Sequence, residues 1–344
     1  MRWWQRLRGG RRLAGPRDAD MAVREALAAL LDREPERAEA LLGRVVRDDS
    51  DQVDVYLALA ALYRQQGEVG RAIRIHQNLL LRAELPRHLH GAALRGLARD
   101  FQGGGFLKRA LAAWQEILDE APKDAEALRA LARIHAELRD YVRALDLERR
   151  LGRLEGHRSR GREADLLVEM ARVAQAEGRS DDARKAVRKA LRRDARCVAA
   201  WIESGALEAE RGRAKRALAA WKKVPELDHQ AAASVYPRVE ATFASLGRAR
   251  EFEAWLRELL QARPGDAVAR LALARSLAAR GDGAAGLAEL DAVLERDPES
   301  LPARGARARL LLAEGREAEA LKEFGELLDA IDEKGLLAAR ERLG

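Results

Sequence analysis

Apolar residues along this 344-residue chain recur at helical spacing in short stretches that polar turns separate. In one of the clearest stretches, Tyr56, Leu59, Ala60 and Tyr63 fall at i, i+3, i+4 and i+7, which places them on one face of a helix. Gly67 follows this stretch, and a glycine directly after a helical pattern is typical of a helix end that needs a positive φ. The pattern therefore predicts a helix that ends close to Gly67.

A second helical pattern begins within a few residues of that turn, with Ala72, His76 and Leu79 on its apolar face. Two such helices with a short turn between them predict a helical hairpin whose apolar faces pack together. Ala72 marks the place where the helices cross closely and only a small side chain fits. The same skeleton recurs further on, most completely between Leu94 and Pro122.

The residue at the helix crossing recurs at intervals of 34, 38, 34, 39, 34, 35, 34 and 34 residues, as Ala38, Ala72, Ala110, Ala144, Ala183, Ala217, Phe252, Gly286 and Ala320. A period of about 34 residues is typical of the tetratricopeptide repeat. We therefore predict an all-α fold, a right-handed superhelical solenoid of about nine helix-turn-helix units. Phe252 in place of a small residue predicts a distorted seventh unit. The two longer intervals predict insertions near Leu85–His90 and Gly152–Glu163.

This organisation predicts three segments: a basic tail rich in arginine and tryptophan at residues 1–18, the solenoid at 19–334 and a capping helix at 335–344. The net charge is +7, but residues 1–18 contain six arginines and one aspartate, a charge of +5, which leaves +2 for residues 19–344. A nucleic-acid-binding body is basic as a whole or along a stripe. The tryptophans of the repeats also fall at packing positions. We therefore expect no nucleic-acid partner.

Several kinds of chemistry are not expected from this sequence. Cys197 is the only cysteine, which excludes a disulfide framework and a zinc site built from several thiolates. The six histidines are scattered, no glycine-rich phosphate loop follows a strand, and no nucleophile lies in a recognisable motif. No stretch of about 18 residues is apolar enough to span a membrane. We expect a cytoplasmic protein that is not an enzyme and has no metal or cofactor.

In this kind of repeat, positions two, five, nine and twelve of the first helix line the concave groove. In units two to five these positions carry a row of arginines, whereas the sixth unit offers mainly apolar residues. An exposed ion pair contributes only about 0.2–1 kcal/mol, so we expect several arginines to act together with apolar anchors. We predict that this groove binds an acidic or C-terminal segment of a partner protein, through Arg64, Arg95, Arg99, Gln102, Arg129, Arg133, Arg172 and Gln175.

The N-terminal tail has a composition suited to the headgroup region of an anionic membrane, with Arg2, Trp3, Trp4, Arg6 and Arg8 close together. At about 1 kcal/mol per basic residue near the surface, such a tail would give weak, reversible attachment. A solvated tail without membrane contact is the alternative.

The stretch from Gly67 to Leu80, GEVGRAIRIHQNLL, resembles the second-repeat signature of the bacterial lipopolysaccharide assembly protein B family, in which GEVDRAIRIHQ is typical. The stretch LARDFQGGGFLKRA in the next unit is similar to that family's L-G-R-D-Y stretch. Gly70 replaces the family's usual aspartate. The resemblance covers roughly residues 20–334 and carries over the signature positions Arg71, Arg74, His76 and Gln77.

The resemblance implies an adaptor at the cytoplasmic face of the inner membrane. It would bring the deacetylase of lipid A synthesis to a membrane-bound ATP-dependent protease and so limit lipopolysaccharide synthesis. The family also carries an N-terminal transmembrane helix and a C-terminal rubredoxin-like zinc domain with paired CxxC motifs, and neither pattern is present in these 344 residues. The alternatives are a general assembly scaffold or chaperone-like module for another envelope complex, and a repeat domain detached from a glycan-processing enzyme.

Overall fold

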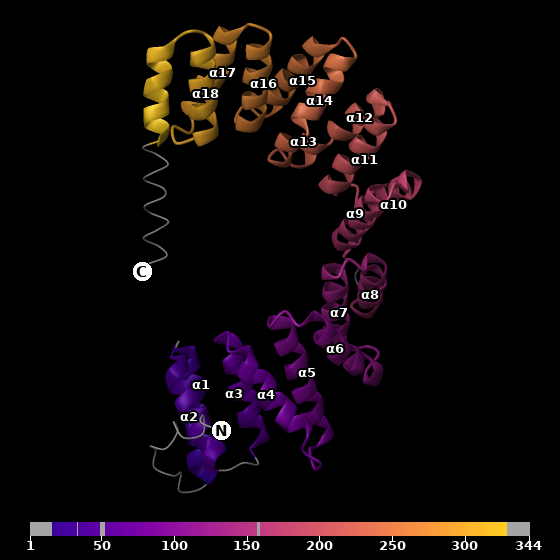
Figure 1. The fold of residues 1–344 in the computed structure, drawn as a ribbon, viewed down its shortest axis with the longest axis vertical. Helices are drawn as coiled ribbons and strands as arrows, with labels where there is room; N and C mark the ends of the chain where they lie inside the picture. The colour runs from indigo at the N-terminus through magenta and orange to yellow at the C-terminus, as the bar shows by residue number, and fades with distance from the viewer. Residues whose placement is uncertain (1–15, 33, 49–51, 157–158, 329–344) are drawn as a thin grey trace. The chain divides into compact units, whose positions relative to one another are not determined.

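The computed structural model describes residues 16–32, 34–48, 52–156 and 159–328, and within these ranges the regular structure is helical, with no strand. The chain divides into two compact units, unit 1 up to Leu166 and unit 2 from Leu167. In each unit, consecutive helices pair into antiparallel hairpins, as the colour sequence of Figure 1 lets the reader follow. The predicted all-α fold of about nine hairpins is confirmed for the described residues.

Unit 1 consists of four hairpins and the beginning of a fifth. Its first helix begins at Pro16, slightly before the expected boundary at residue 19. Neighbouring helices along the chain pack against one another, and α3 also contacts α5, the first helix of the next hairpin. The helices are α1 (Pro16–Leu31), α2 (Pro35–Asp48), α3 (Val53–Gln65), α4 (Val69–Leu80), α5 (Arg87–Gly103), α6 (Leu107–Glu120), α7 (Ala125–Glu137), α8 (Tyr141–Leu154) and the start of α9 (Arg160–Ala176).

Unit 2 continues from within α9, and its described part ends with a hairpin formed by α18 and the helical residues 317–328. The helices after α9 are α10 (Ser180–Arg193), α11 (Val198–Glu210), α12 (Ala214–Trp221), α13 (Val224–Leu227), the 3₁₀ helix η2 (Ala231–Ser234), α14 (Tyr236–Ser245), α15 (Ala249–Ala262), α16 (Ala267–Ala279), α17 (Gly283–Leu294) and α18 (Leu301–Ala313).

The crossing residues are buried as the period predicts, with exposed fractions of 0–1% from Ala38 to Ala320 for the alanines and Phe252. At Gly286 even a Cβ atom would lie 2.9 Å from Leu310 Cδ2 and 3.0 Å from the carbonyl oxygen of Ala274, so the helices approach there more closely than alanine allows. The turn after α3 places Gly67 at φ 80°, as predicted. In the fourth hairpin Arg139 takes this position at φ 59°, a conformation that is costly for a residue with a Cβ.

The seventh hairpin is distorted, as Phe252 predicts. Before it, α12 is only 8 residues long, and the chain then passes through α13 and η2 before α14 begins. Phe252 is buried and its ring lies 6.1 Å from that of Trp255, which makes an edge contact with Tyr236 at 5.8 Å. This aromatic cluster stands where the other hairpins have a small crossing residue, and α14 and α15 contact each other less extensively than α3 and α4 or α16 and α17 do.

The two predicted insertions lengthen helices and add little loop. The helices α5 and α9 have 17 residues each, compared with 13 in α3 and α7. In the second insertion Gly152 lies within α8 and Glu163 within α9, and both are buried. Two ion pairs join α8 to α9, one from Arg149 to Glu163 at 3.4 Å and one from Arg162 to Glu148 at 3.2 Å.

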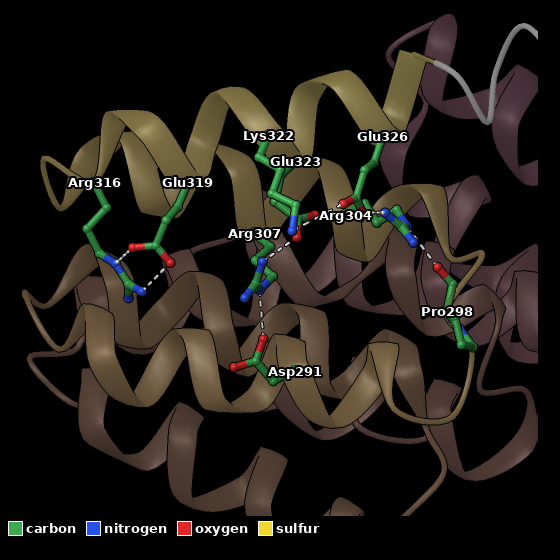
Figure 2. Close-up of polar contacts among 9 residues, drawn as sticks. All are labelled: Asp291, Pro298, Arg304, Arg307, Arg316, Glu319, Lys322, Glu323 and Glu326. Atoms are coloured by element: carbon green, nitrogen blue, oxygen red, sulfur yellow. Dashed lines mark hydrogen bonds and ion pairs between the residues drawn. The ribbon is translucent and has the colours of Figure 1, made fainter.

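The last hairpin is held to its neighbour by charged side chains (Figure 2). Arg307 of α18 donates to Asp291 of α17 at 2.7 Å and pairs with Glu323 in the final helix. Arg304 pairs with Glu326 and donates to the carbonyl oxygen of Pro298 at 2.7 Å. These contacts connect three successive helices where the apolar core becomes small.

Candidate protein-binding surfaces

The predicted binding residues lie on the first helices of successive hairpins. Arg64 is on α3, Arg95, Arg99 and Gln102 on α5, Arg129 and Arg133 on α7, and Arg172 and Gln175 on α9. The last two belong to unit 2 and the others to unit 1. All of these side chains are exposed or half exposed, as the helical register predicts.

All of the predicted arginines of unit 1 except Arg133 are paired with carboxylates, which sequence analysis did not anticipate. Arg95 donates to Asp124 at 2.8 Å, and Arg99 lies 2.6 Å from Glu126 at the start of α7. Arg129 reaches Glu155, just after α8, at 2.6 Å. The surface is therefore a row in which guanidinium and carboxylate groups alternate.

Unit 2 has a similar arrangement of its own. Arg172 contacts Glu169 on its own helix at 2.6 Å and Glu203 on α11 at 2.7 Å, and Gln175 donates to Glu210. Arg133 differs from these residues, because it is exposed and forms no ion pair or hydrogen bond with any residue in the described ranges. It is the guanidinium of this row that a partner could reach without displacing an internal carboxylate.

Asp124 illustrates how strongly one carboxylate can be integrated into the row. It is the N-cap of α7, where its Oδ1 accepts from the backbone N–H of Ala127 at 2.8 Å, and it also accepts from Arg95. Partial burial opposes ionisation of Asp124, but the N–H of Ala127 and the guanidinium of Arg95 outweigh it and lower the pKa of Asp124. The hydrogen bond with Asp124 in turn raises the pKa of Arg95.

A buried polar network joins three helices of unit 1. Asp100 on α5 is fully buried and accepts from Arg64 of α3 at 2.7 Å and from Nδ1 of His76 of α4 at 2.6 Å. His76 is 2% exposed, and Gly96 on α5 provides the room for its ring, because a Cβ at Gly96 would lie 2.6 Å from His76 Cε1. Arg64 and His76 therefore connect neighbouring hairpins.

Asp100 is the residue of this network that sequence analysis missed. Its signal was present in the stretch LARDFQGGG, where an aspartate falls on the apolar face of an otherwise regular helical pattern. A charged residue in such a position indicates a buried partner of opposite charge.

The four signature residues divide into two groups. His76 belongs to the buried network, and Arg71 forms an ion pair with Glu68 at 2.7 Å while its guanidinium lies over the ring of Tyr63. Arg74 and Gln77 are exposed on α4, and Arg74 donates to the carbonyl oxygen of Gly70 at 3.1 Å. The signature therefore combines residues that hold the hairpin with residues that are available to a partner.

Unit 2 contains a second candidate surface, an apolar groove of about 630 Å³. It lies along the first helices α14, α16 and α18, with η2 at one end. Positions two, five, nine and twelve of α16, which are Val268, Leu271, Arg275 and Ala278, all line it. The sequence rule that selected the arginine row would have found these residues had it been applied to the eighth unit.

The remaining expectations concern metal binding, membrane spanning and the two ends of the chain. No group of three or more His, Cys, Asp or Glu side chains in these residues could hold a metal ion. None of the described helices is both long and apolar enough to cross a membrane. The membrane-surface candidates Arg2, Trp3, Trp4, Arg6 and Arg8 and the expected capping helix at 335–344 lie outside the described residues.

Paired helices at a 34-residue period define a repeat protein whose surfaces serve protein binding. A family model of the tetratricopeptide repeat matches residues 95–155, 168–234 and 271–335, and the chain belongs to this family. Curated relatives share the name lipopolysaccharide assembly protein B. The Escherichia coli K12 protein is 27% identical over 269 residues, which cover 78% of this chain and 69% of the relative. The Haemophilus influenzae protein is 26% identical over 254 residues, 74% of this chain and 64% of the relative.

Solved structures with a similar fold include a crystal structure of MamA, 18% identical, with a TM-score of 0.35 over 50% of this chain and 93% of that one. A tetratricopeptide repeat protein from Parabacteroides merdae is 14% identical, with a TM-score of 0.42 over 86% of this chain and 98% of that one. The family resemblance seen in the signature stretches is thus supported by the curated relatives over most of the chain.

Proposed function

We propose that this chain is a non-enzymatic adaptor in the control of lipopolysaccharide synthesis, which binds the deacetylase of lipid A synthesis and directs it to a membrane-bound ATP-dependent protease. The names of the curated relatives and the repeat architecture support the coarser part of this proposal, a protein-binding repeat protein of lipopolysaccharide assembly. The two partners follow from the family resemblance. The observation that carries the binding site is the row of guanidinium groups on α3, α5 and α7 of unit 1.

The internal pairing of this row is compatible with binding, because the pairs are weak and exchangeable. The side chains of Arg99 and Arg129 are almost half exposed, and such surface ion pairs contribute about 0.2–1 kcal/mol each. An acidic segment can replace Glu126 or Glu155 as the partner of a guanidinium at little net cost. Arg133 offers a first contact that requires no displacement.

The same exchange gives the surface selectivity for its partner. A segment with a single carboxylate gains little binding free energy, because it replaces one weak ion pair by another. A segment whose carboxylates are spaced to meet several guanidinium groups at once gains from each of them. It also gains from the effective concentration that the first contact provides.

The adaptor would work at the inner face of the membrane, where the N-terminal tail supplies weak attachment.

The test is a titration of the purified full-length chain with the purified lipid A deacetylase encoded in the same genome, by isothermal calorimetry at low and moderate salt. The informative variant is Arg133→Glu, since it breaks no ion pair within the described residues. Its matched control is Lys108→Glu on α6, which makes the same change of charge at another exposed residue without such a pair.

We expect micromolar binding that weakens with salt, a loss of about fivefold or more in Arg133→Glu, and a change of less than twofold in Lys108→Glu. Absence of binding by the wild-type chain would refute the choice of partner. Equal binding by both variants would refute the site and leave the partner standing.

A further inference from the structure

Positive charge is concentrated in one part of unit 2. Residues 179–223 contain 14 lysines and arginines and 6 aspartates and glutamates, a net charge of +8. Residues 19–344 carry +2 in all, so the rest of that range has a net charge of −6. The basic segment contains α10, α11 and α12, and the arginine row uses none of its cations. Such a concentration of cations attracts anionic groups.

A pocket of about 190 Å³ lies among these three helices. It is smaller than the pockets of about 300–1,000 Å³ that hold drug-sized ligands, and its size suits a compact group. Four of its lining residues are arginines, which come from α10, from α12 and from the turn before α12: Arg184, Arg188, Arg213 and Arg216. Ser204 and Glu208 of α11 add a hydroxyl and a carboxylate, so the lining side chains carry a net charge of +3.

Several donors of this pocket lack an acceptor in the described residues. Arg188 is exposed and Ser204 is half exposed, and neither side chain has a hydrogen bond or an ion pair within the described ranges. Arg184 pairs with Asp181, but its Nε donates no hydrogen bond to any described residue. An anion in the pocket would supply acceptors to such donors.

Glu208 compensates only part of the positive charge. Its Oε2 is buried and accepts no hydrogen bond from the described residues. Arg213 and Arg216 lie 3.5 and 3.9 Å from this oxygen, which is longer than a hydrogen bond. Arg216 is also 70% exposed, so its guanidinium can turn to another anion without loss of a buried contact.

The ligand that fits these groups is a phosphate group. Guanidinium groups bind carboxylates and phosphates through charge-assisted hydrogen bonds, often in pairs. A carboxylate has only two oxygens. A phosphomonoester has three acceptor oxygens and a charge of about −1.5 to −2, so it can accept from several donors around one pocket.

Cations outside the pocket favour a phosphate that is presented on a membrane. Three exposed basic residues on α10 and α12 have no ion pair within the described ranges: Lys189, Arg192 and Lys215. A basic residue near an anionic lipid surface contributes about 1 kcal/mol of attraction. Neighbouring headgroups would meet these cations, whereas a soluble phosphate would fill the pocket alone.

The aromatic residues of the basic segment do not favour a nucleic acid. They are Trp201 and Trp221, of which the first is half buried and the second is 3% exposed. Their indole N–H groups donate to the backbone carbonyl oxygens of Ala195 and Ile202, at 2.9 and 3.1 Å. The segment therefore lacks an exposed aromatic ring on which a base could stack.

We propose that the pocket between α10, α11 and α12 binds the phosphomonoester group of an anionic lipid headgroup. Arg188, Arg213 and Arg216 would pair with the phosphate oxygens, and Ser204 would donate a hydrogen bond. The exposed cations of α10 and α12 would contact the headgroups around it. This contact would hold unit 2 against the membrane surface.

The first measurement tests whether the pocket binds phosphate. Broadening of the ³¹P signal of inorganic phosphate is followed in titrations with the purified full-length chain. Arg188→Gln removes one cation and Glu208→Gln removes the carboxylate. Arg250→Gln on α15 is the matched control, since Arg250 is exposed and has no ion pair within the described ranges. Circular dichroism establishes that each variant is folded.

We expect Arg188→Gln to weaken phosphate binding at least fivefold and Arg250→Gln to change it by less than twofold. Glu208→Gln should strengthen binding at least twofold, because it removes the negative charge of the pocket. Loss of a merely structural ion pair would not produce such a gain. Absence of binding to the wild-type chain at about 10 mM phosphate, or equal binding by Arg188→Gln, would overturn the proposal.

The second measurement identifies the source of the phosphate group. Co-sedimentation compares phosphatidylcholine vesicles that contain phosphatidic acid, a monoester, with vesicles in which phosphatidylglycerol, a diester, supplies the same surface charge. The N-terminal tail is the same in every variant, so it contributes equally to all of them. We expect the chain to bind the phosphatidic acid vesicles at least threefold more tightly, with a smaller preference in Arg188→Gln and an unchanged one in Arg250→Gln.

Two outcomes would overturn the assignment to lipid. Equal binding of both kinds of vesicle, with phosphate binding intact, would assign the pocket to a soluble phosphate ester. Displacement of inorganic phosphate by duplex DNA, but not by phosphatidic acid vesicles, would assign it to a nucleic acid.

None of these results depends on the deacetylase, because no residue of the pocket belongs to the arginine row. Failure here with success in the deacetylase titration would remove the phosphate site alone. The reverse outcome would leave a phosphate-binding repeat protein with another partner on its arginine surface.

Discussion

Replacement of Asp100 by alanine is the most direct test of how the hairpins of unit 1 are joined. The change removes the acceptor shared by Arg64 and His76, and it leaves the apolar face of α5 otherwise intact. Each of the three residues comes from a different helix, so the loss affects the contacts between α3, α4 and α5 together.

The magnitude follows from the exposure of the two groups that lose their partner. Removal of one member of a buried ion pair costs about 3–5 kcal/mol when the other charge stays buried. Arg64 is 24% exposed and can recover part of its hydration, whereas His76 is 2% exposed and cannot. We therefore expect the lower end of this range, about 3 kcal/mol, which corresponds to a factor of roughly a hundred in an equilibrium constant.

Hydrogen exchange is the suitable assay, because repeat proteins open locally and each hairpin contacts mainly its neighbours. Amides of α4 and α5 should exchange about a hundredfold faster in Asp100→Ala, and those of α16 and α17 should be unchanged. Asp119→Ala removes an exposed carboxylate on α6 that, among the described residues, accepts only from Gln115, and it should change exchange by less than threefold. A change below fivefold around Asp100 would refute the assigned role of the network.

Three further predictions concern backbone and electrostatic features. Gly96→Ala should lower the free energy of unfolding by about 1–3 kcal/mol in urea titrations, because the added Cβ overlaps the ring of His76. Gly91→Ala on the same helix has open space around it and should raise the free energy of unfolding by about 0.5–1 kcal/mol. Equal effects of the two changes would contradict the close approach at Gly96. Asp124→Ala should cost about 1 kcal/mol at pH 7 through loss of the cap. Because folding lowers the pKa of Asp124, its ionised form stabilises the folded protein at pH values above the unfolded pKa of 3.8, and this contribution is lost as the pH falls through the folded pKa. The loss of stability in Asp124→Ala should therefore shrink on acidification, and a loss that grows would contradict the assigned role. Arg139→Gly should raise the midpoint of thermal unfolding, since it relieves a positive φ, and a lower midpoint would show that the side chain outweighs the strain.

Much of the fold could be predicted because a helical hairpin is specified locally. The positions of Tyr56, Leu59 and Tyr63 define an apolar face through the geometry of the helix alone. The crossing alanines then define where each hairpin packs. The same local information predicted the distortion at Phe252, since an aromatic ring cannot occupy the space of a methyl group.

The binding surfaces could be predicted only in part. The register identified which arginines lie on the exposed face, but it did not reveal that Arg95 and Arg99 are paired with Asp124 and Glu126, about 30 residues further along the chain. The register also gives the lining positions of the apolar groove, but it does not give the volume of the groove. Its volume depends on which side chains of α16 and α18 face each other, and that depends on how neighbouring hairpins are rotated.

The sequence by itself determined the period, the helical hairpins, their small crossing residues and the family resemblance, because these depend on side-chain size and spacing within one repeat. Only the tertiary structure decided that Asp100 is buried between Arg64 and His76, which arginines have internal partners, and where space remains for a ligand. These features depend on distances between hairpins, and such distances are set by packing over the whole interface between repeats.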